Sequence, residues 1–222
     1  MPNLVKNHSL TIAMLVLFVV SLLGMVLTGY RHYNEDQREH GQQTVGVVEY
    51  VATGAFVEAL FENWESEFLQ MGLYVLLTAF FFQKGSSESK DPDGNEEVDE
   101  DPREAGHRSD VPGPVKQGGL ALLLYENSLA LALLALFVIS FALHALGGAS
   151  EYNEEQRAHG GETVSVLGYL ATSRMWFESF QNWQSEFLSV AALVVLSIFL
   201  RQRGSPESKP VGTPHSTTGV ES

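Results

Sequence analysis

The chain has 222 residues, a formal net charge of −14 and no cysteine. The acidic balance argues against nucleic-acid binding, because phosphate neutralisation requires Lys and Arg, and against electrostatic docking on anionic lipid. The absence of Cys excludes a disulfide framework, thiol catalysis and Cys-based zinc sites. Apolar residues make up 45% of the chain, and most of them fall in four runs.

The first apolar run covers residues 10–29 and contains no charged residue. Twenty helical residues rise about 30 Å, which matches the hydrocarbon thickness of a bilayer. A signal peptide would have a shorter apolar core, followed by a cleavage site with small residues. A closely related run recurs at residues 128–148, whereas signal peptides do not recur within a chain. Both runs therefore predict transmembrane helices.

Two further runs, at residues 68–82 and 187–200, are shorter. Each falls about five residues short of a hydrocarbon core of ~30 Å. Charged residues follow both runs at once, so we expect the helices to extend backwards, giving spans at about 62–83 and 181–201. Trp64 and Trp183 would then anchor these helices at the membrane interface, where Trp is favoured. Local thinning of the bilayer is the alternative way to absorb the shortfall.

A polar phrase, YNEDQREHG at residues 33–41, returns as YNEEQRAHG at residues 152–160. At this offset of 119 residues, positions 9–90 and 128–209 match at 39 of 82 places, and the matches include the polar loops. Duplication of a two-span unit explains this pattern. We therefore predict an all-α membrane protein in which four transmembrane helices form two tandem, parallel helical-hairpin repeats in one pseudo-twofold bundle.

The predicted domains follow from this repeat. Residues 1–90 hold the first two-span repeat and residues 120–204 the second, and the acidic linker (91–119) and the tail (205–222) are predicted to be disordered. Most Lys and Arg residues flank the spans on the side of the termini and linker, so the positive-inside rule predicts cytoplasmic N- and C-termini.

Glycines and turn residues predict where the helices begin and end within each repeat. Gly41 and Gly160 are expected to end the first helix, with a histidine in its last turn. Gly54 and Ser173 are expected to begin the second long helix.

The phrases YNEEQRAHG and ENWESEFLQ, which flank the hydrophobic spans, resemble an uncharacterised bacterial family of multi-pass membrane proteins, classed as a domain of unknown function. The resemblance covers nearly the whole chain apart from the acidic linker. It implies a place in the bacterial cytoplasmic (inner) membrane, and it brings no activity and no functional residues.

Glu67 and Glu186 are the strongest candidates for a functional site. An ionisable residue within a span is costly, and is usually paired or faces a polar cavity. Asn63 precedes Glu67 by four residues, and Asn182 precedes Glu186 by four, so each pair shares one helix face. Two such faces meeting at a pseudo-twofold axis would give a polar site for an ion or a proton. The alternative places both glutamates at the headgroup level, bonded to a loop donor.

Histidines suggest a second kind of site. His40 and His159, together with the two candidate glutamates, would supply two imidazoles and two carboxylates to a transition metal. The alternative is that each histidine simply interacts with the dipole at its helix C-terminus. His144 matches Met25 in the repeat, so we expect it to make a polar contact between spans rather than to share a repeated role.

Catalytic patterns such as G-x-S-x-G, H-E-x-x-H, phosphate-binding glycine loops and dinucleotide fingerprints do not occur. The sequence therefore favours a non-enzymatic structural or partner-binding membrane protein without a cofactor. Its expected partners are the lipid bilayer and either another protein or a second copy of the chain. The alternatives are a small transporter or channel with a central polar site around Glu67 and Glu186, and, third, a membrane metal-binding protein.

Overall fold

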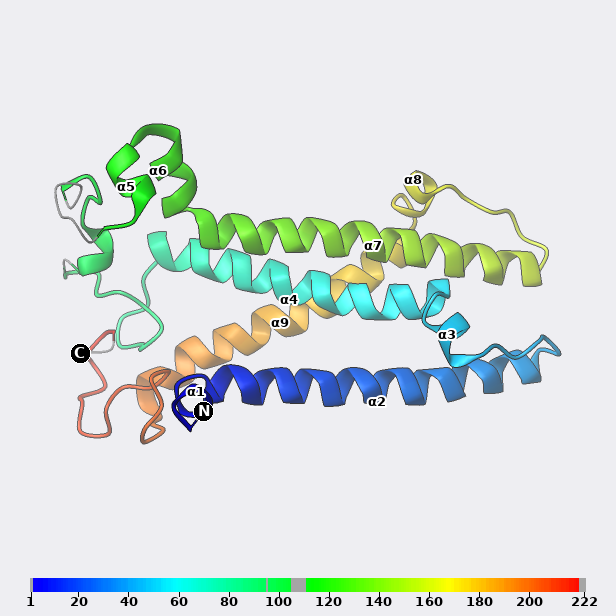
Figure 1. Cartoon of the computed structure of the whole chain (residues 1–222), viewed down its shortest axis with the longest axis horizontal. Coiled ribbons are helices and arrows are strands. Elements are labelled where there is room, and N and C mark those ends of the chain that lie inside the picture. The colour runs from blue at the N-terminus through cyan, green and yellow to red at the C-terminus, as the bar shows by residue number, and fades with distance from the viewer. Residues whose placement is uncertain (1, 95, 105–110, 220–222) are drawn as a thin grey trace. The chain divides into compact units, whose positions relative to one another are not determined.

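The computed structural model describes residues 2–94, 96–104 and 111–219, and within these residues the chain is helical and has no strand. This confirms the predicted all-α class. Four long helices dominate the fold (Figure 1): α2 (Ser9–Glu39), α4 (Gly54–Phe80), α7 (Ser128–Ala158) and α9 (Ser173–Phe199). The short elements are α1 (Pro2–Asn7), α3 (Val47–Tyr50), η1 (Glu97–Asp99), α5 (Gly113–Gln117), α6 (Gly119–Glu126) and α8 (Val166–Tyr169).

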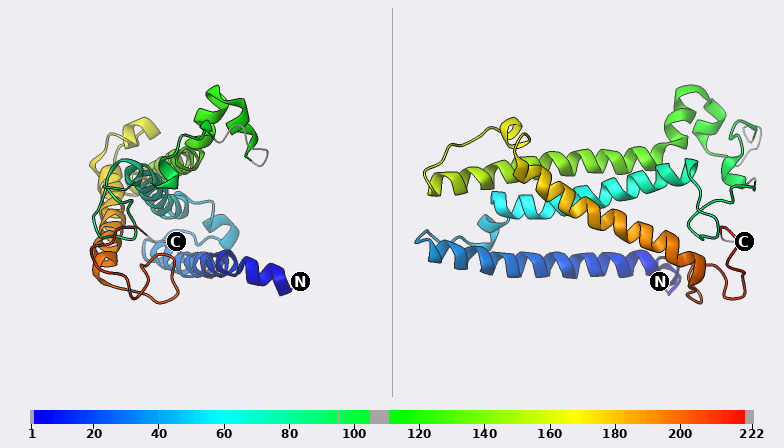
Figure 2. Two further views of the ribbon diagram at one scale, coloured as in Figure 1. Left: turned by 90° about the vertical axis from the view of Figure 1, so that its left-hand side faces the viewer. Right: turned by 180° about the vertical axis from the view of Figure 1, so that it is seen from behind.

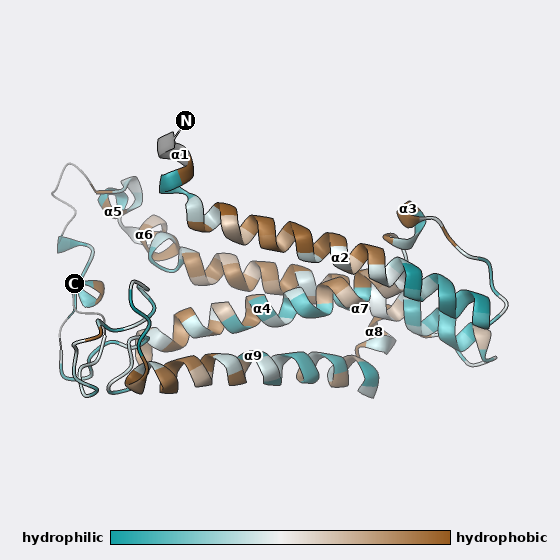
Figure 3. Ribbon diagram, turned by 90° about the horizontal axis from the view of Figure 1, so that it is seen from below, coloured by the Kyte–Doolittle hydropathy of each residue, from teal (hydrophilic) through white to brown (hydrophobic). Residues whose placement is uncertain are grey.

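Three of the long helices, α2, α7 and α9, are long and apolar enough to cross a membrane. In Figure 3, α2 is brown over most of its length and turns teal only at its C-terminal end, where the polar phrase begins. Large apolar side chains such as Leu17 and Val20 are exposed along α2. Contiguous exposed apolar surface of this kind suits lipid better than water.

The fourth long helix, α4, does not meet the same criterion. It has 27 residues, which is long enough to span, but its first half carries Glu58, Glu62, Glu65 and Glu67. The helix is therefore long enough to span but not apolar enough to meet the criterion, and the predicted span at residues 62–83 is not confirmed.

The described residues form two compact units. Unit 1 comprises the described residues up to Leu60 together with His144–Tyr169, and unit 2 comprises Phe61–Leu143 and the chain from Leu170 onward. The further views in Figure 2 show α2 and α7 as continuous helices. In each case the polar phrase begins within the same helix as the apolar run before it.

Helix bounds recur with the repeat. The bounds of α7, α8 and α9 each lie 119 residues after those of α2, α3 and α4. The predicted ends are confirmed, because α2 and α7 stop just before Gly41 and Gly160, whose φ angles are 69° and 72°. The predicted starts of the second long helices at Gly54 and Ser173 are also confirmed.

An asparagine fastens the loop after the first helix in both repeats. The amide of Asn34 accepts from the backbone N–H of Val45 at 2.8 Å and donates to the Val45 carbonyl at 3.1 Å. Asn153 makes the same two bonds with Val164, at 2.7 and 2.9 Å. One side chain therefore satisfies both the N–H and the C=O of a loop residue. Without it, these two backbone groups would lack the partners that a helix or sheet supplies.

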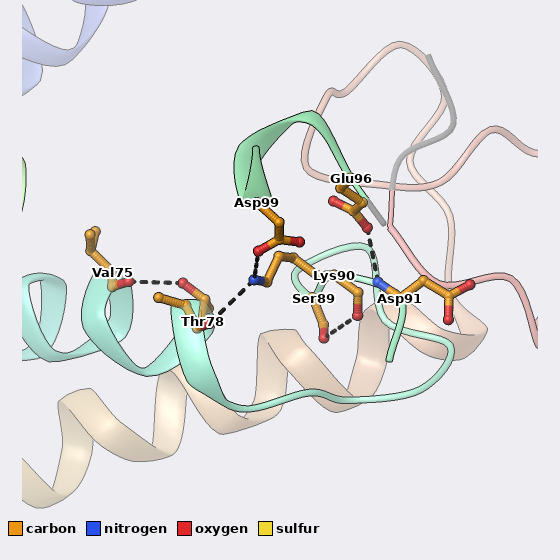
Figure 4. Close-up of polar contacts among 8 residues, drawn as sticks. Val75, Thr78, Ser89, Lys90, Asp91, Glu96 and Asp99 are labelled. Atoms are coloured by element: carbon orange, nitrogen blue, oxygen red, sulfur yellow. Dashed lines mark hydrogen bonds and ion pairs between the residues drawn. The ribbon is translucent and has the colours of Figure 1, made fainter. Parts of the chain in front are cut away.

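The loop after α4 is also held by hydrogen bonds (Figure 4). Lys90 forms an ion pair with Asp99 and donates to the Ala79 carbonyl at the C-terminal end of α4, 3.2 Å away. Asp91 donates its backbone N–H to Glu96 at 2.9 Å. A cation at a helix C-terminus is favoured by the helix dipole. The start of the linker predicted to be disordered is thus hydrogen-bonded in the structure, while its residues 95 and 105–110 lie outside the described part.

In the tail, Lys209 likewise donates hydrogen bonds to backbone carbonyls. Its ammonium group is buried and donates to the carbonyls of Gly85, His215 and Thr217, the last two at 3.0 and 2.9 Å. Burial, and secondarily the charge of Arg201, lowers the pKa of Lys209 below its usual value. Within unit 2 this one ammonium group thus bonds to several backbone carbonyls, and the disorder predicted for the tail stays a prediction.

Candidate functional site

A buried polar cluster lies in unit 1, where the start of α4 meets α7 and α8. Tyr169 donates from its hydroxyl to Oε1 of Glu58 at 3.1 Å. A carboxylate oxygen of Glu58 and a ring nitrogen of His144 lie within 4.8 Å of each other. The exposed fractions are 7% for Glu58 and 0% for His144 and Tyr169. Three ionisable side chains therefore lie near one another away from solvent, and the polar interhelical contact expected of His144 stays a prediction.

Glycines on α7 let these side chains approach. A Cβ on Gly147 would lie 2.5 Å from the backbone nitrogen of Glu58, and one on Gly148 would lie 2.5 Å from the hydroxyl oxygen of Tyr169. Small residues allow helix backbones to approach closely in membrane proteins. The close backbone packing fixes where Glu58 and Tyr169 meet.

Unit 2 has a separate buried carboxylate, Glu65. Its Oε1 accepts hydrogen bonds from Ser179 at 2.8 Å and from the indole N–H of Trp183 at 3.2 Å, and the side chain is fully buried. A buried charge is tolerated when such partners satisfy it. Trp183, expected as an interface anchor, thus also serves as a hydrogen-bond donor inside the unit. Trp64, the matching anchor, packs on Phe61 with 5.2 Å between ring centroids.

The predicted carboxylate pair also lies in unit 2. Glu186 is half-buried and is acted on by the negative charge of Glu67, which is itself exposed. Asn63 is exposed, and Asn182 donates to the carbonyl of Glu178 on its own helix at 3.1 Å. The two glutamates therefore interact electrostatically, while Asn182 serves its own helix. Their role as an ion site remains a prediction.

The two copies of the polar phrase line one pocket in unit 1, with a volume of about 550 Å³. His40 and His159 both line it, together with Asp36, Glu154 and Glu155. The Nδ1 atom of each histidine lies within hydrogen-bonding distance of a backbone carbonyl of its own helix, at 3.0 Å for His40 and 2.9 Å for His159. Three of the four carboxylates that line the pocket thus come from the phrase, and Glu151 directly precedes its second copy, whereas Glu67 and Glu186 belong to unit 2. The predicted metal role of the histidines remains a prediction.

Tyr50, the repeat counterpart of Tyr169, lies in α3 against α2. A Cβ added to Gly29 would overlap the hydroxyl of Tyr50, just as a Cβ added to Gly148 would overlap the hydroxyl of Tyr169. Its ring packs on Phe56 with 5.3 Å between centroids, and burial raises the pKa of its phenol. The tyrosine–glycine contact thus belongs to both repeats, whereas the carboxylate partner belongs to Tyr169.

Sequence reasoning missed Glu58 and Glu65 as the buried acids of α4. The two residues are seven apart and share one face with Gly54 and Gly72, all four of them buried. Residues at this spacing fall on one side of a helix. The sequence could have indicated these buried acids, because they share a helix face with glycines. Glycine on one face of a helix indicates that this face meets another backbone closely.

The fold and these sites define a helical protein with three helices suited to a membrane and with buried carboxylates on a fourth long helix. A family model described as Domain of unknown function (DUF6766) matches residues 1–220, so the chain belongs to that family. No curated protein and no solved structure is significantly similar to the chain.

Proposed function

We propose that the chain is an integral protein of the bacterial inner membrane with four spans, arranged as two tandem, parallel hairpins in a pseudo-twofold bundle. The identical offset of three pairs of helices supports the repeat. The asparagine fastening, present in both hairpins, supports it at the level of single hydrogen bonds. The distribution of Lys and Arg supports cytoplasmic termini.

In this proposal α4 is the fourth span. Its glutamates would be costly in lipid, but Glu58 accepts from Tyr169, and Glu65 accepts from Ser179 and Trp183. Satisfied carboxylates on a protein-facing stripe lower the cost of placing α4 in the membrane. A helix of this kind crosses as an inner element and needs less apolarity than the lipid-facing α2.

We propose further that the protein is non-enzymatic and binds a protein partner through the pocket formed by the two polar phrases. One observation carries this proposal: both copies of the phrase line the same pocket, at the polar ends of α2 and α7. Four carboxylates (Asp36, Glu151, Glu154 and Glu155) line the pocket against one cation, Arg157, and this negative balance favours a partner with a cationic segment. The duplicated phrase would then be a recognition surface outside the lipid.

Site-specific crosslinking tests this proposal, because the chain has no native Cys. Single-cysteine variants Asp36→Cys and Glu155→Cys would be treated in intact cells with a membrane-impermeant, cysteine-reactive photocrosslinker. A discrete adduct at both positions is expected, and its mass shows whether the partner is a different protein or a second copy. The adduct from Asp36→Cys should vanish when Glu154→Lys and Glu155→Lys are added. Absence of any adduct, or an adduct unchanged by charge reversal, contradicts the proposal.

The alternative function, a small transporter or channel, draws on the electrostatic interaction of Glu67 with Glu186. It predicts ion or proton flux in proteoliposomes, which Glu67→Gln combined with Glu186→Gln abolishes. Flux that survives this double change removes both residues from a transport mechanism. The partner-binding proposal predicts no flux and unchanged crosslinking in the same variant.

A further inference from the structure

Two copies of one polar loop follow α4 and α9. Their sequences are QKGSSESK at residues 83–90 (loop A) and QRGSPESK at residues 202–209 (loop B), and both lie in unit 2. The two loops fold alike, because the third residue is a glycine with a φ angle of 88° in loop A and 87° in loop B. In each loop the backbone N–H of the first glutamine donates to a serine Oγ, at 2.8 Å and 2.9 Å. The same sequence pattern therefore gives the same backbone surface twice.

The C-terminal tail covers loop A. The N–H of Gly85 donates to Oγ1 of Thr218 at 2.8 Å. The N–H of Gly219 donates to the carbonyl of Ser86 at 2.9 Å. Both loop residues are buried. A segment that presents a hydroxyl followed by a glycine N–H thus satisfies two backbone groups of this loop.

The matching site on loop B is open. Gly204 is exposed, and a Cβ on it would meet nothing within 4 Å, whereas a Cβ on Gly85 would lie 2.8 Å from the carbonyl oxygen of His215 in the tail. The N–H of Gly204 and the carbonyl of Ser205 form no hydrogen bond with any described residue. Both residues line a cavity of about 630 Å³. Loop B therefore leaves open the two backbone groups that loop A uses to hold the tail.

We propose that loop B binds an extended segment of another protein, in which a threonine or serine is followed by glycine. The hydroxyl oxygen would accept from Gly204 and the glycine N–H would donate to the carbonyl of Ser205, as Thr218 and Gly219 do on loop A. Main-chain hydrogen bonds of this kind give affinity for extended peptides. The tail of the chain is itself bound to loop A, so the occupant of loop B comes from a different protein. The site is separate from the pocket of the polar phrases, which lies in unit 1.

A fluorescent peptide with the sequence of tail residues 210–219 tests the proposal on the full chain in detergent. We expect saturable binding of one peptide per chain, measured by fluorescence anisotropy, because loop A is occupied by the tail. A peptide with Thr218→Val should bind about 2–10-fold more weakly, because it lacks one hydrogen-bond acceptor. A photoreactive residue in the peptide in place of Ser216, which is exposed in the tail, should crosslink to loop B.

Gly204→Asn should abolish peptide binding, because its side chain would lie where a backbone carbonyl of the tail lies on loop A. Asn is one of the residues that best tolerate a positive φ. The matched control is Gly41→Asn, at a glycine of unit 1 that also has a positive φ and nothing within 4 Å of an added Cβ. This control should bind the peptide as wild type does. Circular dichroism shows whether both variants are folded, and the Thr218→Val peptide supplies the test if Gly204→Asn is not.

Four outcomes overturn the proposal. They are absence of binding to the wild-type chain, undiminished binding to folded Gly204→Asn, equal affinity of the Thr218→Val peptide, and crosslinks that map to loop A. A wild-type oligomer that the peptide converts to monomers would also overturn it, because the occupant would then be the tail of a second copy.

Discussion

Tyr169 donates a hydrogen bond of 3.1 Å to Glu58, although the two residues lie in different repeats of the chain. Its repeat counterpart, Tyr50, makes the same close approach to a glycine and has no such acceptor among the described residues. Both tyrosines pack against a glycine, and of the two only Tyr169 also donates to a glutamate. Comparing them therefore separates the effect of packing from the effect of this hydrogen bond. Several expected outcomes depend on this difference.

Tyr169→Phe should destabilise the protein, because it removes the donor from a buried carboxylate. The loss of a hydrogen bond to a buried acceptor costs about 1–3 kcal/mol. Tyr50→Phe is the matched control and should change stability by less than about 0.5 kcal/mol. Thermal unfolding in one detergent measures both, and a double-mutant cycle of Tyr169→Phe with Glu58→Gln should give a coupling of about 0.5–3 kcal/mol. Strict additivity in the cycle would show that the two residues do not interact.

Gly148→Ala should destabilise the protein, because the new Cβ would fall 2.5 Å from the Tyr169 hydroxyl oxygen. Overpacking of this kind costs about 1–3 kcal/mol. Gly24→Ala tests the same change in α2, where a Cβ meets nothing within 4 Å. Better helix propensity predicts a neutral or slightly stabilising effect there, of up to about 1 kcal/mol. Equal unfolding midpoints for the two variants would contradict the packing of Tyr169 against α7.

Glu65→Leu should cost more stability than Glu65→Gln. The leucine leaves the donors of Ser179 and Trp183 without their buried acceptor, and each unsatisfied group costs about 1–3 kcal/mol. Glutamine keeps one acceptor oxygen and is the residue that the second repeat carries, as Gln184. Glu67→Gln, at an exposed position, is the control and should change stability by less than about 0.5 kcal/mol. A neutral Glu65→Leu would mean that these hydrogen bonds contribute nothing to stability.

Local signals made the helix bounds predictable from sequence. Gly41 and Gly160 end their helices because a positive φ is easily adopted by glycine. The start of α4 at Gly54 followed from the repeat and from the turn residues before it. These features depend on a few neighbouring residues, so no knowledge of tertiary packing was needed.

Which acid of α4 is buried was not predictable in the same way. Glu67 attracted attention because both repeats keep it, yet Glu67 is exposed and Glu65 is buried. Two residues along a helix amount to about 200° of rotation, so the choice rests on which face meets other helices. Composition likewise gives no sign that Lys209 will be buried and will donate to the carbonyls of Gly85, His215 and Thr217.

The central claim is that α4 crosses the membrane together with α2, α7 and α9. Single cysteines at positions 36, 93 and 155 of the otherwise cysteine-free chain can be labelled with a membrane-impermeant maleimide, in intact cells and after lysis. Four spans predict that positions 36 and 155 react in intact cells and that position 93 reacts only after lysis. If α4 does not cross, positions 36 and 93 will behave alike and position 155 will behave oppositely, which would contradict the account.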